Sequence, residues 1–462
     1  MGHFLVIGGG IGGLGAALLA ARRGHTVEVF ERDGRAPGAG LDADFFGWRR
    51  PGVPQANQPH ALLGAARAVL RAELPDVYAD MLRRGARERH ELDWFEERPP
   101  TRPGDEDLVM IQARRIVLES ALTAALHAEP RVLVRYGEPV TGLDVRPGDP
   151  PRVTGVRTGS EVYEGELVID AAGRRGGTER WLTEAGCRPP AVERHRTGLA
   201  YFCRWYRLPD GRLDGPVRPW AVTGGTFAGC AVFPADNGVF AVNLFVHTDD
   251  PTRGALRDPA VFEAAARTFP PGAAWLDLGA DALSEVLATA SLDNRWSALY
   301  DERGPIATGI VPVGDAITHT NPTIGQGMSL ALWAAQWVAH HGHEAPASAE
   351  FTAAYHAWAL RTLKPWFDFQ VVADAAIGDR FATRTSRAGI AREVAALFDC
   401  ALDDPEVMRA RARVRHLAAS PAQAYGAGEV QERVGAWLAA RPGYTPHAAG
   451  PDRREWEKIT AS

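Results

Sequence analysis

The first thirty positions show an apolar pattern that changes its period twice. The short apolar run 3–7 predicts a strand, and residues 14–23 predict a helix that ends at Gly24. The β-branched run 26–31 predicts a second strand. Six glycines stand within residues 6–15, where the first strand meets the helix. Because glycine is costly to order, this βαβ pattern predicts a ligand that approaches the backbone closely at the first turn.

The spacing of these glycines is typical of dinucleotide binding. In a G-x-G-x-x-G turn the first glycine makes the tight turn, the second lets a diphosphate reach the backbone, and the third lets helix and strand pack closely. Free N–H groups at the helix start then hold the phosphate charge, and an acidic residue after the second strand binds the ribose. The motif leaves FAD and NAD as alternatives. The predicted dinucleotide-binding residues are Gly8, Gly10, Gly12, Gly13, Glu31 and Arg32.

A second glycine-containing segment lies far downstream. The apolar run 310–313 predicts a strand that leads into Gly314 and Asp315, and a polar loop then precedes a long apolar helix that opens at 325–327. This arrangement resembles the second flavin motif of FAD-dependent aromatic hydroxylases, the para-hydroxybenzoate hydroxylase-like monooxygenases. The resemblance favours FAD over NAD as the bound dinucleotide.

The resemblance implies roles for five residues of this segment. Asp315 would accept a hydrogen bond from the ribityl chain of FAD, and Pro322 would border the isoalloxazine ring. The helix that opens at Gly325 would direct its positive end at the flavin pyrimidine and stabilise negative charge there. Gly327 and Met328 occupy the matching positions at the start of that helix.

Two segments in the middle of the chain extend the resemblance. "QARRIVLESAL" is similar to the family's R-x-x-L-E-x-x-L helix, whose arginine lies near the ribityl and phosphate groups, and this role falls on Arg115. "EGELVIDAAGRRGG" is similar to the family's D-G motif through Asp170 and Gly173, although Ala171 replaces its usual second glycine. In this family that motif touches both FAD and the arriving nicotinamide cofactor. The resemblance therefore implies NAD(P)H, such as NADPH, as the reductant.

Histidines near these motifs receive no chemical role. "RRPGVPQANQPHALL" resembles a bacterial natural-product branch of the superfamily, in which His60 keeps one histidine of the pattern and is expected to be structural. His319 follows the second flavin motif, and we expect it to lie at the surface. No catalytic residue is assigned, because in this family the cofactor carries the chemistry.

Residues 196–246 consist of short aromatic and β-branched segments, with a hairpin turn expected at Asn237 and Gly238. They predict an antiparallel sheet, which resembles the family's substrate domain beside the flavin. As a group its aromatic residues indicate an apolar, bulky substrate. The chain after Gly342 predicts helices, one of them broken near Pro365, that cover the pocket or form a dimer surface. The candidate pocket walls are Phe202, Trp205, Trp220, Phe233, Phe240 and Phe245.

Composition excludes several classes of function. The net charge of −6 and the scattered arginines argue against a nucleic-acid binder. The four cysteines are widely spaced, so neither a metal site nor a disulfide framework is predicted. No apolar run is long enough to span a membrane. We therefore expect a soluble cytoplasmic protein, a monomer or homodimer whose partner is a small apolar molecule.

The order of the motifs predicts an α/β fold with a discontinuous, Rossmann-like FAD-binding domain, an inserted antiparallel β-sheet substrate domain and a C-terminal helical region. The predicted boundaries are 1–75, 111–185 and 293–345 for the FAD-binding domain, 76–110 for a first substrate-domain insertion, 186–292 for the β-sheet substrate domain and 346–462 for the helical region.

The resemblance implies an FAD-dependent oxidoreductase: a monooxygenase, either hydroxylase or epoxidase, that uses a flavin C4a-hydroperoxide on a bulky secondary metabolite such as a polyketide, for example in antibiotic biosynthesis. The alternative is a redox-neutral cyclase in which FAD is structural and the pocket folds a polyene for cycloaddition. A halogenase would share the fold, but the chain lacks a W-x-W-x-I-P segment and a well-placed lysine. A flavin-bound sensor is disfavoured, because a deep apolar pocket has little purpose without a ligand.

Overall fold

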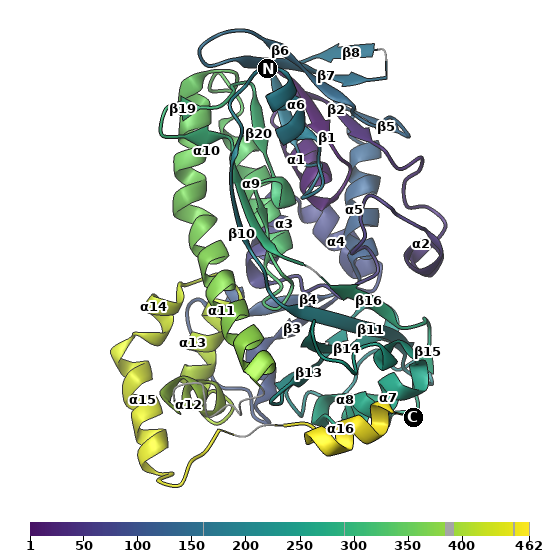
Figure 1. Cartoon of the computed structure of the whole chain (residues 1–462), viewed down its shortest axis with the longest axis vertical. Helices are drawn as coiled ribbons and strands as arrows, with labels where there is room; N and C mark the ends of the chain where they lie inside the picture. The colour runs from purple at the N-terminus through teal and green to yellow at the C-terminus, as the bar shows by residue number, and fades with distance from the viewer. Residues whose placement is uncertain (160, 291, 384–391, 447–448, 462) are drawn as a thin grey trace.

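The molecule contains two main β-sheets, which lie near its two ends and are joined by helices (Figure 1). The computed structural model describes residues 1–159, 161–290, 292–383, 392–446 and 449–461. The parallel sheet and its helices form one end, and the antiparallel sheet with the last helix forms the other. Together with the C-terminal helices, these layers confirm the predicted α/β fold.

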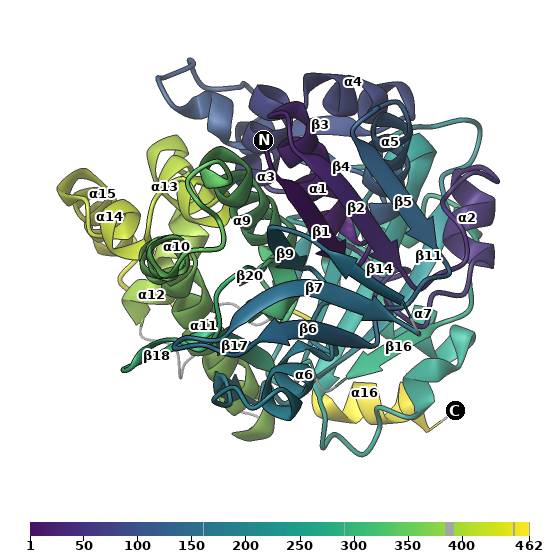
Figure 2. The ribbon, with the colours of Figure 1, turned by 90° about the horizontal axis from the view of Figure 1, so that it is seen from above.

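The parallel sheet contains five strands whose neighbours all run in the same direction. Residues 4–7, 167–170 and 310–312 of this sheet are buried because both of its faces are covered there, whereas the edge strand at 132–136 is partly exposed. The helices α1 (Ile11–Arg22), α5 (Arg115–His127) and α9 (Gly327–His341) cover one face. The strands β6 (Gly142–Arg146), β7 (Arg152–Thr158) and β8 (Glu161–Glu164) form a small sheet over the other face, and Figure 2 shows β6 and β7 beside the parallel strands. The order across the parallel sheet is β20 (Ile310–Pro312), β9 (Leu167–Asp170), β1 (His3–Ile7), β2 (Thr26–Glu31) and β5 (Val132–Tyr136).

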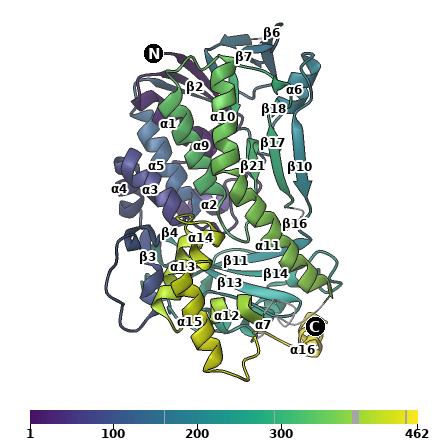
Figure 3. The same cartoon turned by 90° about the vertical axis from the view of Figure 1, so that its left-hand side faces the viewer.

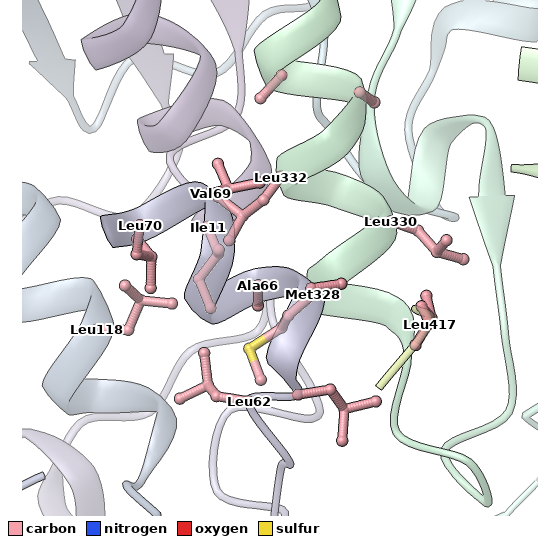
Figure 4. Packing of buried hydrophobic residues seen from close by; sticks show 14 of the residues in the cluster. Ile11, Leu62, Ala66, Val69, Leu70, Leu118, Met328, Leu330, Leu332 and Leu417 are labelled. Atoms are coloured by element: carbon pink, nitrogen blue, oxygen red, sulfur yellow. The ribbon is translucent and has the colours of Figure 1, made fainter. Parts of the chain in front are cut away.

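The main hydrophobic core lies between the two glycine-opened helices and their neighbours. In Figure 4, Met328 of α9 lies beside Ala66 of α3 (Gly64–Glu73) and beside Leu62. Each of these side chains is at most 8% exposed. Burying a side chain as large as Met328 or Leu62 contributes about 2 kcal/mol, so this packing holds the start of α9 against α3.

The antiparallel sheet is built around the hairpin of β13 (Ala228–Pro234) and β14 (Val239–His247), with β11 (Leu199–Arg207) on the other side of β14. The predicted turn is confirmed: Asn237 has a φ of 54°, and the N–H of Ala235 donates to the carbonyl of Val239 at 2.8 Å. Shorter strands pair at the edges: β12 (Val222–Gly224), β15 (Asp281–Ala282) and β16 (Leu287–Ala290). The outer face of the sheet packs on α7 (Pro259–Arg267), α8 (Pro270–Leu276) and α16 (Arg453–Thr460).

Shorter ladders and helices lie beside and between the two main sheets. The β3–β4, β10–β17–β21 and β18–β19 ladders are all antiparallel. These shorter elements are α2 (Leu41–Gly47), α4 (Pro75–Arg83), α6 (Thr178–Glu184), β3 (Arg87–His90), β4 (Val109–Gln112), β10 (Ala191–His195), β17 (Asn294–Ala298), β18 (Tyr300–Asp301), β19 (Gly304–Pro305) and β21 (Thr318–His319). Single 3-10 turns lie at Glu91–Trp94, Asp105–Asp107, Asp236–Gly238, Ala255–Arg257 and Gly314–Ala316.

Two helices, α10 (Ala349–Thr362) and α11 (Lys364–Thr383), form an arm that runs from the parallel sheet to the antiparallel sheet (Figure 3). The predicted break near Pro365 is confirmed, because a proline lacks the N–H that would continue α10 but is accommodated in the first turn of α11. The remaining helices are α12 (Arg392–Cys400), α13 (Pro405–Arg415), α14 (Pro421–Tyr425) and α15 (Gly428–Ala439).

Among the described residues, no helix combines the length and the apolar character needed to span a membrane. The same residues contain no group of three histidine, cysteine or acidic side chains placed to hold a metal ion. All four cysteines are buried and carry no disulfide.

Candidate active site

A cavity of about 970 Å³ connects the two halves of the molecule. At one end it is lined by the turn between β1 and α1 and by the residue that ends β2. In the middle it is lined by the segments 52–61 and 319–328. At the other end it reaches the inner face of the antiparallel sheet and the helices α11, α12 and α13. The motifs that are far apart in the sequence therefore open onto one space.

The first glycine turn has the close backbone approaches that its spacing predicts. Gly8 has a φ of 101°, and a Cβ there would lie 2.6 Å from the carbonyl oxygen of Ala171. A Cβ on Gly13 would lie 1.9 Å from the carbonyl oxygen of Gly8, so α1 can sit this close to β1 only without a side chain. Gly10 precedes α1, and within the described chain no side chain caps the first N–H groups of that helix. These N–H groups remain available to an anion in the cavity.

Glu31 ends β2 with its carboxylate at the same end of the cavity. It is 7% exposed and accepts hydrogen bonds from the N–H of Gly9 at 2.5 Å and from the N–H of Asp33 at 2.7 Å. A carboxylate has about four acceptor positions, so two remain for a ligand hydroxyl. Arg32, which follows Glu31, is exposed and lines the opening next to Gly52.

Arg115 is held at the glycine turn by a chain of charges. Its Nε donates to Glu119 at 2.8 Å, and Glu119 also accepts from Arg50 at 2.6 Å. Burial raises the pKa of Glu119, but the two guanidinium groups outweigh burial and hold that pKa below its ordinary value. The Nη2 of Arg115 lies 3.7 Å from the position that a Cβ on Gly10 would take. The carboxylate thus fixes Arg115 while leaving a cationic edge toward the turn.

The second glycine-opened helix, α9, presents its N-terminus to the same cavity. Gln326 precedes it, and in the described structure no side-chain hydrogen bond caps the first turn, which also lacks acidic residues. Gly325, Gly327 and Met328 line the cavity at this point, and Asp315 lines it nearby. Two positive helix ends therefore face one cavity.

Eleven of the twelve predicted cofactor residues line this cavity. The exception is Gly13, which is packed beneath Gly8 and so has the packing position expected of the third glycine. The set of groups suits FAD in kind: free N–H groups and a guanidinium for a diphosphate, a buried carboxylate for a ribose, and a second helix N-terminus for an electron-rich ring.

The predicted pocket walls are correct for three of the six aromatic residues. Trp220, Phe233 and Phe245 line the cavity. Phe202 and Phe240 do not, because side chains alternate along a strand and these two point to the outer face, against α7 and α8.

Trp205 faces the inner side of the sheet but also lies outside the cavity wall. It packs against Phe45, with ring centroids 5.0 Å apart. Tyr201, which the prediction missed, lines the cavity and donates its hydroxyl hydrogen to Asn321 Oδ1 at 2.9 Å. The alternation of "LAYFCRWYRL" separates Tyr201 from Phe202 but does not indicate which of them faces a ligand.

Two histidines line the middle of the cavity. The Nδ1–H of His60 donates to the carbonyl of Gln58 at 2.8 Å, and burial together with the nearby Arg115 lowers the pKa of His60 to about 4. His60 is therefore neutral at physiological pH. The expectation that His319 lies at the surface is wrong: it is 7% exposed, and its Nδ1–H donates to the carbonyl of Asp293 at 2.8 Å. The pairing of β21 with β17 draws this residue inward.

The C-terminal helices supply cavity residues to which the sequence prediction gave no individual role. Phe398 of α12 and Arg411 and Arg415 of α13 line the far end of the cavity, and Tyr425 of α14 joins them. The guanidinium of Arg411 lies 4.2 Å from the ring centre of Trp220. Arg415 forms an ion pair with Glu91 at 3.2 Å. No local motif marks these residues, because their position depends on how the helices fold back onto the sheet.

Comparisons with known proteins agree with this architecture. The NAD(P)-binding Rossmann-like domain family matches residues 6–71. Protein Rv3254 of Mycobacterium tuberculosis is 29% identical over 366 residues, which cover 71% of this chain and 70% of that protein. PqsL of Pseudomonas aeruginosa, described as a probable FAD-dependent monooxygenase, has a TM-score of 0.61 and 20% identity, covering 83% of this chain and 99% of its own.

A further solved structure with this arrangement is PyrE3, a Diels-Alderase in the biosynthetic pathway of pyrroindomycins. Its TM-score is 0.58 and its identity 18%, over 90% of this chain and 80% of its own. At these identities the likeness concerns the fold. The chain therefore has the fold found in FAD-dependent monooxygenases, which confirms the resemblance suggested by its motifs at the level of architecture.

Proposed function

We propose that this chain is an FAD-dependent monooxygenase that hydroxylates or epoxidises a bulky, apolar secondary metabolite such as a polyketide, with NAD(P)H as the reductant. The observation that carries the proposal is the single cavity that joins two uncapped helix N-termini to the aromatic inner face of the antiparallel sheet. A cofactor at the β1–α1 end of the cavity and a substrate at the end beside the antiparallel sheet would meet in the middle of this space.

The residues of the first end would hold the cofactor. The N–H groups at the start of α1 and the guanidinium of Arg115 would bind the diphosphate, and Glu31 would accept a hydrogen bond from the ribose. The start of α9, next to Asp315, would face the ring system and stabilise negative charge on it. Bound FAD would supply the redox chemistry with O2, so the chain needs no acid–base pair of its own.

The residues of the second end would hold the substrate and exclude water. Phe233 and Phe245 of the sheet, with Trp220 beside them, supply apolar rings. Phe369 and Ile377 of α11 close the same space from the side. Excluding water from such a site protects a reactive intermediate from hydrolysis. His60 stays neutral in the middle of the cavity, so it adds no positive charge there.

A redox-neutral cyclase is the second candidate. It is favoured by the likeness to a Diels-Alderase and by Ala171, which replaces the usual second glycine in the segment that resembles the D-G motif of aromatic hydroxylases. In such an enzyme FAD would shape the cavity, and the aromatic wall would fold a polyene.

One experiment separates the two candidates. The purified protein should carry equimolar FAD, and NADPH consumption should rise together with O2 uptake when an aromatic polyketide is added. Turnover of a polyene without O2 and without NADPH consumption would instead establish the cyclase. A colourless protein that does not take up FAD would refute both.

Substitution of Arg115 tests the assignment of the cofactor end. Arg115→Gln removes the cationic edge beside Gly10, and we expect FAD affinity to fall about tenfold, the effect of losing about 1.4 kcal/mol. Arg146→Gln, which removes an exposed guanidinium of β6 that pairs with Glu164, is the matched control and should leave FAD affinity unchanged. Titration of the FAD-depleted protein with FAD, followed by flavin fluorescence, measures both.

A further inference from the structure

The inner face of the antiparallel sheet carries one amide that the fold leaves without a partner. Asn243 lies in β14, lines the cavity and is only 6% exposed. Its Oδ1 is buried and receives no hydrogen bond from any residue that the structure describes. Most buried polar atoms in native proteins have a partner, so an exception in a cavity wall points to a missing ligand.

The neighbours of Asn243 cannot satisfy it. In the sheet register it stands opposite Cys203 on β11 and Ala231 on β13. Two positions along its own strand, on the same face, stand Ala241 and Phe245. Burial raises the pKa of the Cys203 thiol, which therefore stays neutral and is a weak donor. Its neighbours on this face of the sheet are thus small or apolar, and none of them supplies a strong donor to the amide oxygen, which lines the cavity wall.

The position is also unfavourable for asparagine on grounds of folding. Asparagine is disfavoured within strands, and a buried amide without a partner lowers the stability of the folded protein. Leucine has the same number of side-chain heavy atoms and would remove this cost. Such a residue is expected where its hydrogen bonds are made to a bound molecule rather than to the protein.

We propose that Asn243 is a specificity-determining residue that binds a hydroxyl group on the ring system of the substrate. The hydroxyl would donate a hydrogen bond to Oδ1 and accept one from Nδ2, because a side-chain amide carries both an acceptor and a donor. This inference rests on the proposed function only in taking the sheet end of the cavity as the substrate site. It narrows the substrate class from an apolar ring system to a hydroxylated one.

The test compares ligand pairs that have the same shape and differ in the hydroxyl group. The pairs are 1-naphthol with 1-methylnaphthalene, 2-naphthol with 2-methylnaphthalene, and 1-hydroxyanthraquinone with 1-methylanthraquinone. Isothermal titration calorimetry measures binding to the wild-type protein and to Asn243→Leu. The matched control is Thr318→Val, which removes a different buried polar group, a hydroxyl without a partner among the described residues, at a position outside the cavity wall. Asn243→Ala replaces the leucine variant if that variant does not fold.

We expect the wild-type protein to bind the hydroxylated member of at least one pair about tenfold more tightly. Asn243→Leu should lose this preference, whereas Thr318→Val should keep it. Both variants should melt at a higher temperature than the wild type, which is the opposite of what loss of a structural hydrogen bond would cause.

The proposal is overturned if the wild type binds the members of every pair equally or binds none of them, or if Asn243→Leu keeps the preference. The FAD content of each preparation is read from its absorbance. A protein that lacks flavin but shows the hydroxyl preference would refute the monooxygenase and retain the role of Asn243.

Discussion

At the scale of single residues, close packing decides which glycines can change. Gly12 and Gly13 are adjacent in α1, yet a Cβ on Gly12 would make an ordinary contact at 3.6 Å with Ala331, whereas one on Gly13 would collide with backbone. The same motif therefore contains glycines with different physical tasks. Gly13 serves the packing of helix on strand, and Gly12 faces the cavity.

Alanine substitutions separate these tasks. Gly13→Ala should lower the free energy of unfolding by about 3 kcal/mol, because the backbone of the turn must shift. Gly12→Ala should leave it within about 1 kcal/mol of the wild type, because alanine suits a helix better than glycine and meets no clash. Urea unfolding followed by circular dichroism measures both, and equal losses would contradict the packing role of Gly13.

A second prediction at this scale concerns acid. The pKa of His60 falls from 6.5 in the unfolded chain to about 4 in the folded protein. Protons therefore bind the unfolded chain more strongly, so this residue leaves stability unchanged above pH 6.5 and lowers it as the pH falls toward 4, by about 3 kcal/mol at the end. His60→Gln should show a smaller loss between pH 6.5 and pH 4 in denaturant titrations. An unchanged acid dependence would argue that His60 is exposed to water.

At the scale of elements, a buried ion pair joins α5 to the hairpin of the antiparallel sheet. The side chains of Arg114 and Asp236 are 1% and 0% exposed and form two parallel hydrogen bonds of 3.0 and 2.6 Å. Asp236 also accepts the backbone N–H of Arg114 at 2.9 Å. Because Arg115 follows Arg114, this contact links the sheet to the cofactor end of the cavity.

Loss of the carboxylate should be costly only where it is buried. Asp236→Asn leaves the guanidinium of Arg114 buried with weaker compensation, and we expect a loss of about 3 kcal/mol in unfolding free energy. Asp76→Asn is the control, because Asp76 forms a similar pair with Arg22 but is 54% exposed, and it should cost less than about 1 kcal/mol. The two values come from denaturant unfolding at pH 7, and a similar cost for both would refute the argument from burial.

At the scale of the whole molecule, helix α11 of the arm formed by α10 and α11 holds the loop that leads into α9. Asp374 of α11 is 1% exposed and accepts hydrogen bonds from Asn294 at 2.7 Å and from Asn321 at 2.9 Å, and also from Thr323. Burial raises the pKa of Asp374, although these hydrogen bonds favour its charged form. Thr323 lines the cavity, so α11 determines the position of the loop around Pro322.

Removal of this contact should loosen the proposed ring site. Asp374→Ala removes the carboxylate to which three polar groups donate, and we expect FAD affinity to fall about tenfold through loss of a preformed loop. Asp368→Ala, on an exposed face of the same helix, should leave the affinity unchanged. Flavin fluorescence titration measures both, and equal affinities would mean that the loop is held by other contacts.

The sequence predicted well whatever depends on neighbours along the chain. The strand–glycine–helix pattern of residues 3–23 sets a βαβ unit locally, and the structure reproduces its elements to within a few residues. The hairpin at Asn237 and the break near Pro365 follow in the same way from local backbone chemistry. Phe202 and Phe240 were misplaced because alternation defines two faces of a sheet but not which face meets a cavity.

By itself, the sequence determined two glycine-opened helices, the strands before them and the acidic residue after the first unit, because backbone geometry and periodicity are local. Only the tertiary structure decided that both helix ends open on one cavity and that the C-terminal helices line the far end of that cavity. It also decided that the amide oxygen of Asn243, in the cavity wall, lacks a hydrogen-bond partner among the described residues. These features depend on contacts between residues that are distant along the chain. The burial of apolar surface drives such contacts, and because it is non-directional, a local sequence pattern does not reveal which residues will meet.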